Sequence, residues 1–65
     1  MNNTAIAIEH RHESADIIFL TRWFDSYQEA EVQCQKYRAM GAYFDASRPD
    51  GVLGKFRAIG HFRKP

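Results

Sequence analysis

Cationic side chains alternate near the end of the chain. Four of them share one parity, namely Lys55, Arg57, His61 and Arg63, and residues 51–65 contain no aspartate or glutamate. Side chains two apart in a β-strand point to the same face, so this spacing aligns all four. Aromatic residues accompany them at Tyr43, Phe56, Phe62 and Trp23. A basic stripe with aromatic neighbours is typical of a surface for single-stranded nucleic acid, because rings stack on bases and cations neutralise phosphates.

The same stripe has a structural interpretation. Alternating charge on an exposed edge strand hinders aggregation between sheets. A modest isoelectric point of about 7.9 also argues against a strongly nucleic-acid-binding protein. The sequence leaves both interpretations open.

Arg22 and Trp23 form a second candidate site, since Trp and Arg are the usual anchors of protein–protein contacts. With Lys55, Arg57, His61 and Arg63 they make up the predicted partner-binding set. The alternative is that Trp23, the single tryptophan, is the largest residue of the core.

His10 and His12 lie two residues apart, a spacing at which two imidazoles can chelate zinc or copper. A zinc site needs at least a third ligand, and the candidates, Glu9, Cys34 and His61, do not form a closed motif with them. We expect two partly exposed histidines near a hairpin end, and no metal.

Catalysis is not expected. The chain has no Ser–His–Asp pattern, no glycine-rich phosphate loop and no H-E-x-x-H motif. A domain of 65 residues has little room for a pocket of roughly 300–1,000 Å³ beside a packed core. The lone cysteine, Cys34, cannot form an internal disulfide, which favours a reducing cytoplasmic location, and we expect it to be a buried small side chain. No cofactor is predicted.

The net charge of +1 hides an asymmetry between the halves of the chain. Residues 1–33 carry six acids and two bases, whereas residues 34–65 carry seven bases and two acids. Such asymmetry can indicate a charged partner. It can equally mean that the two halves pair with each other in the fold.

Hydrophobic periodicity predicts four strands and one helix. Ile17 to Phe24 is the clearest strand, and both of its faces are mostly apolar. We therefore expect it to be central, with something covering each side. The other strands are expected at residues 5–12, 42–48 and 52–63, with turns at residues 13–16 and 48–51.

The helix is predicted to run from Tyr27 to Met40. Ser26 and Glu29 have the spacing of a capping box, in which each side chain bonds a backbone N–H of the first turn. Gly41 stands where a helix-ending glycine is expected. The stripe predicted to be buried consists of Tyr27, Ala30, Cys34, Tyr37 and Met40.

Together these elements predict one α+β domain over residues 1–65, in the order ββαββ, with an antiparallel sheet and the helix on one face. The strand order is left open. Gly54 and Gly60, inside the last strand, indicate a bulge or a close backbone approach. Polar residues 1–4 are expected to be disordered, and no signal peptide or membrane-spanning run is expected.

The hairpin–helix–strand layout and the small size resemble those of small phage-encoded inhibitors. Some of these bind host RNA polymerase and others bind defence complexes. The resemblance concerns architecture and implies a non-enzymatic protein that binds and blocks a larger host protein. The alternatives are a nucleic-acid-binding protein that uses the C-terminal stripe and a homodimer that pairs edge strands.

Overall fold

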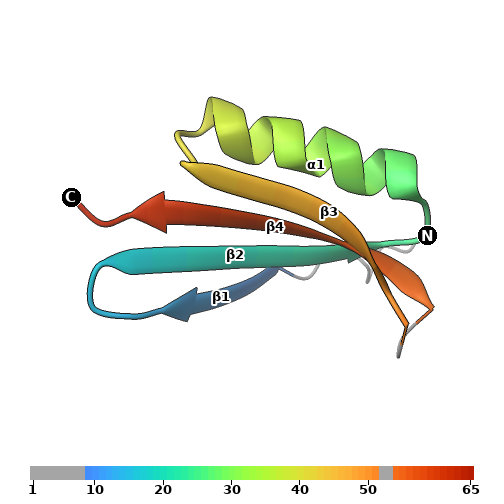
Figure 1. Ribbon diagram of the computed structural model, residues 1–65, viewed down its shortest axis with the longest axis horizontal. Helices are drawn as coiled ribbons and strands as arrows, with labels where there is room; N and C mark the ends of the chain where they lie inside the picture. Colours follow the sequence, from blue (N-terminus) through green and yellow to red (C-terminus); the bar gives the residue numbers. More distant parts are fainter. Residues whose placement is uncertain (1–8, 52–53) are drawn as a thin grey trace, which may run out of the picture.

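The computed structural model describes residues 9–51 and 54–65 (Figure 1). Its elements are β1 (Glu9–Glu13), β2 (Ile17–Phe24), α1 (Tyr27–Ala39), β3 (Phe44–Asp50) and β4 (Lys55–Arg63). The predicted ββαββ order and α+β class are confirmed. The expected disorder of residues 1–4 and the start of the predicted first strand, residues 5–8, lie outside the described residues.

The four strands form one antiparallel sheet in the order β1-β2-β4-β3. The last strand of the chain, β4, therefore lies between β2 and β3 and pairs with both. Helix α1 packs over β2, β4 and β3, and β1 lies at the edge of the sheet farthest from the helix (Figure 1). The connection from β2 through α1 to β3 thus crosses over the position of β4.

The prediction that β2 is central is confirmed, because β1 and β4 flank it. The prediction that both of its faces are covered is wrong for the described part of the chain. The single helix covers one face of the sheet, and no other described element lies on the opposite face. One amphipathic helix can cover only one side of a sheet, so no element within residues 9–51 and 54–65 covers the apolar second face of β2.

Local sequence signals set the ends of the helix. The N-cap Ser26 is extended (φ −130°, ψ 153°), and its hydroxyl oxygen accepts a hydrogen bond from the Glu29 N–H at 3.2 Å. The Glu29 carboxylate accepts from the Ser26 hydroxyl at 3.1 Å, where the capping box predicts a bond to the backbone N–H. The helix ends at Ala39, and Gly41 adopts a φ of +105° that suits glycine.

The core lies between the middle of α1 and the two inner strands. The buried hydrophobic residues are Leu20, Ala30, Cys34, Tyr37 and Ala58. The predicted stripe is correct in its middle and wrong at its ends, because Tyr27 is 44% and Met40 63% exposed. Only the central turns of the helix are pressed against the sheet, so both terminal side chains reach solvent.

The predicted turn over residues 48–51 is wrong. Strand β3 continues through Pro49 to Asp50, and the chain turns between Asp50 and Gly54, whose N–H donates to the Asp50 carbonyl at 3.0 Å. Pro49 pairs with Phe56 inside the ladder. Because β3 is an edge strand, a proline without an N–H is tolerated there. The hairpin turn therefore lies after Pro49 and Asp50, later in the chain than predicted, and β4 begins at Lys55.

Candidate nucleic-acid interface

The side of the sheet opposite α1 is called the open face below. Leu20 and Ala58 are buried under the helix, so residues of the other parity on each strand face the open side. The open face carries His10 and His12 of β1, Ile17, Phe19, Thr21 and Trp23 of β2, Phe44, Ala46, Arg48 and Asp50 of β3, and Lys55, Arg57, Ile59, His61 and Arg63 of β4.

A row of rings crosses the open face, with one ring from every strand. His12 pairs in register with Phe19, Phe19 with His61, and His61 with Phe44. The successive ring centroids are 5.7, 4.6 and 4.8 Å apart. These distances are typical of aromatic pairs in tilted and edge-to-face contact. The four side chains, called the ring row below, therefore form one continuous aromatic strip.

Trp23 stands apart from the ring row on the same face. Its indole Nε1 donates to the Asp50 Oδ2 at 2.9 Å, and the His10 ring meets it edge-on at 5.5 Å between centroids. These contacts hold the indole between β1 and β3. The interpretation of Trp23 as a residue of the core under the helix is therefore wrong, because it lies half-buried on the open face.

Three arginines of the open face, Arg48, Arg57 and Arg63, form no ion pair with a described carboxylate. Arg57 lies directly opposite Arg48 in the β3–β4 ladder. The Arg63 guanidinium stacks 4.5 Å from the centre of the Tyr43 ring. Lys55 differs from these three, because it pairs with Asp25.

The position of β4 tests the structural interpretation of the basic stripe. Protection of an exposed edge requires the charged strand to be at an edge. β4 lies inside the sheet, between β2 and β3, so that interpretation is wrong. The charges of β4 are instead spread over the middle of the open face.

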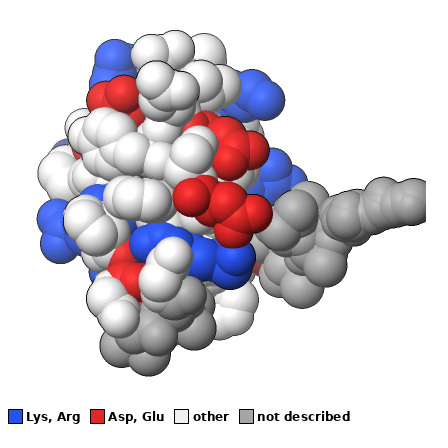
Figure 2. All heavy atoms as spheres, turned by 90° about the vertical axis from the view of Figure 1, so that its right-hand side faces the viewer, with Lys and Arg blue, Asp and Glu red and all other residues white. Residues whose placement is uncertain are grey.

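Pairing between the two halves of the chain explains only part of the charge asymmetry. Lys64 meets Glu13 at 3.1 Å and Lys55 meets Asp25, and both pairs join the acidic half to the basic half. At the end of the molecule where α1 begins, acidic and basic side chains lie side by side (Figure 2). The three open-face arginines take no part in these pairs.

Arg22 is the predicted partner-binding residue that the structure separates from the other five. It lies on the helix side of β2, where its Nε is 3.8 Å from the Glu9 carboxylate. That Nε is buried and has no hydrogen-bond partner among the described residues. Glu9 also accepts a 2.8 Å hydrogen bond from the Tyr37 hydroxyl. Arg22 therefore belongs to the contact between α1 and the β1–β2 hairpin.

His10 and His12 share a face, as the sequence predicts, but their rings lie against Trp23 and Phe19. Within residues 9–51 and 54–65, no group of three or more His, Cys, Asp or Glu side chains is placed to hold a metal ion. Cys34 is buried, as predicted, and burial raises the pKa of its thiol.

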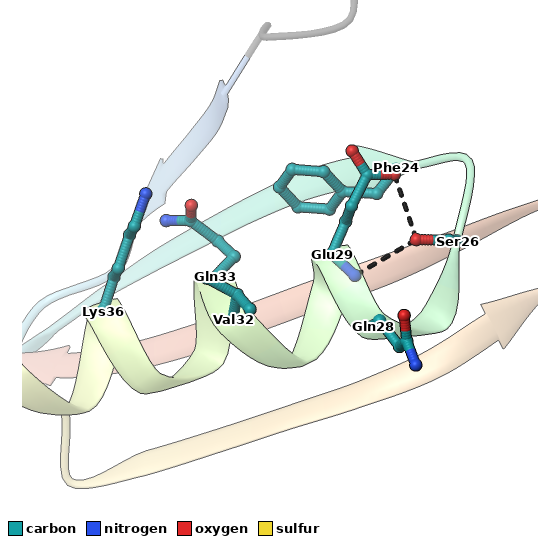
Figure 3. A pocket seen from close by; sticks show the side chains of 7 residues that line it. All are labelled: Phe24, Ser26, Gln28, Glu29, Val32, Gln33 and Lys36. Atoms are coloured by element: carbon teal, nitrogen blue, oxygen red, sulfur yellow. Dashed lines mark hydrogen bonds between the residues drawn. The ribbon is translucent and has the colours of Figure 1, made fainter.

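A shallow pocket of about 330 Å³ lies on the opposite side, beside the start of α1 (Figure 3). Its lining consists of Phe24, Ser26, Gln28, Glu29, Val32, Gln33 and Lys36. Ser26 and Glu29 bond to each other there as part of the helix cap, and Lys36 lies at the far end from them. The polar groups of this pocket therefore serve the helix rather than converge on a ligand.

Sequence reasoning missed the ring row. It placed Phe19 and Phe44 in strands but assigned neither to a site, and it treated His12 only as a metal ligand. The available signal was the apolar second face of residues 17–24 in a chain with one predicted helix. One helix can cover only one side of a sheet, so this pattern predicts an apolar face that the helix does not cover.

None of the described helices is long and apolar enough to cross a membrane. Comparison with protein-family models, with curated proteins and with solved structures finds no match to this chain.

Proposed function

We propose that the open face binds single-stranded nucleic acid. The observation that carries this proposal is the ring row, formed by His12, Phe19, His61 and Phe44. The same face also carries three arginines that form no ion pair with a carboxylate of the described residues. The proposal adopts one of the functions expected from the stripe of β4. It extends the surface from one strand to all four.

The ring row has the dimensions of a stacking platform. Neighbouring strands lie about 4.8 Å apart, so a row across four strands spans about 14 Å. In RNA-recognition modules, aromatic side chains on a four-stranded sheet stack two or three bases. Phe44 is 43% exposed, so its ring is open to a base. Stacking tolerates any base, because every base has a π face, so we expect weak sequence preference.

The charges of the open face complement a phosphate backbone. Arg63 lies on one side of the ring row along β4, and Arg57 lies on the other side. The Asp50 carboxylate on this face accepts from the Trp23 indole, and the Asp25 carboxylate pairs with Lys55. A polyanion therefore meets cations on both sides of its stacked bases.

The second candidate is a protein partner, as the resemblance to phage-encoded inhibitors implies. Its supporting observation is the apolar content of the same face, where Ile17, Ile59 and Trp23 are half-buried under no described element. Trp and Arg together are typical interface anchors. On this hypothesis the protein blocks a larger host protein by covering one of its surfaces. A homodimer through the open face is a third outcome.

Fluorescence anisotropy of labelled oligonucleotides of about 12 nucleotides tests the proposal, because site sizes for such surfaces range from about 4 to 16 nucleotides. We expect single strands to bind more tightly than a duplex, with affinity falling steeply as salt rises. Phe44→Ala should weaken binding about 5- to 150-fold, the equivalent of about 1–3 kcal/mol for one stacked base. The control is Val32→Ala on the outer side of α1, where the side chain is 50% exposed.

The result that overturns the proposal is an absence of binding to every oligonucleotide at low salt. In that case, light scattering over a concentration series separates the two remaining hypotheses. Growth of the particle mass with concentration indicates a homodimer, whereas a constant monomer mass leaves the protein-partner hypothesis.

A further inference from the structure

We infer that Arg48 and Arg57 together hold one backbone phosphate of the bound strand. The inference deepens the proposed function and rests on it. The two arginines are register partners on neighbouring antiparallel strands, and both belong to the open face. Side chains directly opposite each other in such a ladder have Cβ atoms about 4.5–5.5 Å apart. Two guanidinium groups can therefore reach a single anion.

The pair is not explained by the fold itself. Like charges directly opposite each other destabilise a sheet, and neither arginine has an ion pair with a described carboxylate. The Arg57 Nε is buried and lacks a hydrogen-bond partner among the described residues. A phosphate between the two groups relieves the like-charge repulsion, because its oxygens accept from the two guanidinium groups and neutralise their charge.

The neighbouring positions favour this pair over the other cations of the face. Lys55 is engaged with Asp25, and the Arg63 guanidinium is stacked on Tyr43. Arg57 also has Trp23 as its register partner on the β2 side. The two arginines thus carry charges that no described carboxylate pairs with, and they lie beside the Trp23 indole.

The placement of the pair sets the distance between the proposed phosphate and the ring row. On β4, Arg57 lies four residues from His61 of the ring row, a distance of about 13 Å at 3.3 Å per residue. The intervening row consists of His10, Thr21, Ile59 and Ala46, and its members on β2, β4 and β3 have no ring and no charge. The proposed phosphate position therefore lies about 13 Å from the ring row along β4, beside Trp23.

The test is the salt dependence of oligonucleotide binding by Arg48→Gln, by Arg57→Gln and by the double variant. Losing one phosphate contact should lower the slope of log K against log salt by about 0.7 for a single strand. The double variant should lose no more slope than either single variant, because both side chains serve one phosphate. Lys36→Gln, an exposed change on α1, is the matched control and should leave the slope unchanged.

A second measurement uses oligonucleotides with one neutral methylphosphonate linkage moved along the strand. The wild-type protein should lose affinity at one position, and the Arg48→Gln variant should be insensitive at that position. Because Arg48 is exposed, this variant keeps the inference testable even if Arg57→Gln does not fold.

The outcomes separate the inference from the proposed function. If Phe44→Ala weakens binding but the Arg48→Gln and Arg57→Gln variants keep the wild-type slope, the phosphate site is wrong and the stacking surface stands. If the slope of log K against log salt falls in the double variant by the sum of the two single-variant losses, the arginines bind separate phosphates. The inference of a shared site is then wrong. If no oligonucleotide binds, both the site and the proposed function are wrong.

Discussion

The ring of Tyr37 lies directly on the backbone of Gly60. A Cβ atom at Gly60 would come within 2.7 Å of the Cγ and Cδ2 atoms of that ring, closer than real Cβ contacts occur. Tyr37 is fully buried, and Phe62 meets its ring edge-on at 5.9 Å. The glycine in an inner strand thus allows α1 to approach the sheet, as the sequence predicts for a glycine inside a strand.

We expect Gly60→Ala to lower the free energy of unfolding by about 1–3 kcal/mol, the usual cost of forcing atoms into a packed core. Chemical denaturation measures the change. Gly51→Ala is the control, because a Cβ at Gly51 meets nothing within 4 Å. Equal stability of the Gly60→Ala variant and the wild type would show that the ring can move away.

Tyr37→Phe should change stability in alkaline solution. Burial, and then the hydrogen bond to Glu9, raise the pKa of the Tyr37 hydroxyl. In the unfolded chain a tyrosine ionises near pH 10, so the stability that this raised pKa contributes is present below about pH 10 and is lost as the pH rises above it. Because the variant lacks this hydrogen bond, its free energy of unfolding at neutral pH should be lower than that of the wild type by about 0.5–1.5 kcal/mol.

The measurement is the free energy of unfolding of the wild type and of Tyr37→Phe at neutral pH and above pH 10. The gap between the two proteins should narrow as the pH rises. A constant gap would mean that Tyr37 does not hold its proton in the folded state.

Asp45→Asn should reduce acid sensitivity. The Arg38 guanidinium donates two hydrogen bonds to the Asp45 carboxylate, at 2.8 and 3.0 Å, and thereby lowers the pKa of Asp45. A lowered pKa gives stability that is present above the unfolded value of about 3.9 and is lost as the pH falls through the folded value. Circular dichroism recorded during an acid titration should show that the variant loses its folded structure less steeply than the wild type as the pH falls.

Some acid sensitivity should remain in Asp45→Asn, because Arg11 and Lys64 lower the pKa of Glu13 in the same way. Glu31→Gln, at an exposed position of α1, serves as the control for the loss of one carboxylate. Identical acid curves for the wild type and Asp45→Asn would contradict the prediction.

Cys34 should react slowly with thiol reagents in the native protein. It is 5% exposed, and burial raises its pKa, so both access and thiolate content are low. Denaturant should speed the reaction strongly. Gly60→Ala should also speed it, because a less stable fold opens more often. Rapid labelling of the native wild-type protein would show that the helix side opens without unfolding.

Much of the fold follows from local signals. The limits of β2 and the start and end of α1 are encoded by neighbouring residues, such as the Ser26 cap and Gly41. The strand order could not be predicted, because no local pattern reports that β4 enters between β2 and β3. The turn after β3 was misplaced for the same reason, since Pro49 is acceptable in a strand only where that strand is an edge.

The candidate site was predicted in part. Parity along one strand correctly grouped Lys55, Arg57, His61 and Arg63 on one face. The ring row depends on cross-strand register, which brings together His12 and Phe44 from the two edges of the sheet. Register is set by tertiary pairing, so these residues could not be assembled from the sequence alone. Arg22 lies on the opposite face of β2 from its neighbour Trp23, so the structure separates these two predicted residues.

The insertion of β4 between β2 and β3 also constrains how the chain acquires its fold. Until residues 55–63 leave the ribosome, β2 and β3 lack the strand that joins them, and Tyr37 lacks the Gly60 backbone on which it packs. The earlier elements can form only the β1–β2 hairpin and a helix without its sheet. Cooperative folding must therefore follow synthesis of the last strand, so shortening β4 should abolish the whole fold rather than trim one edge.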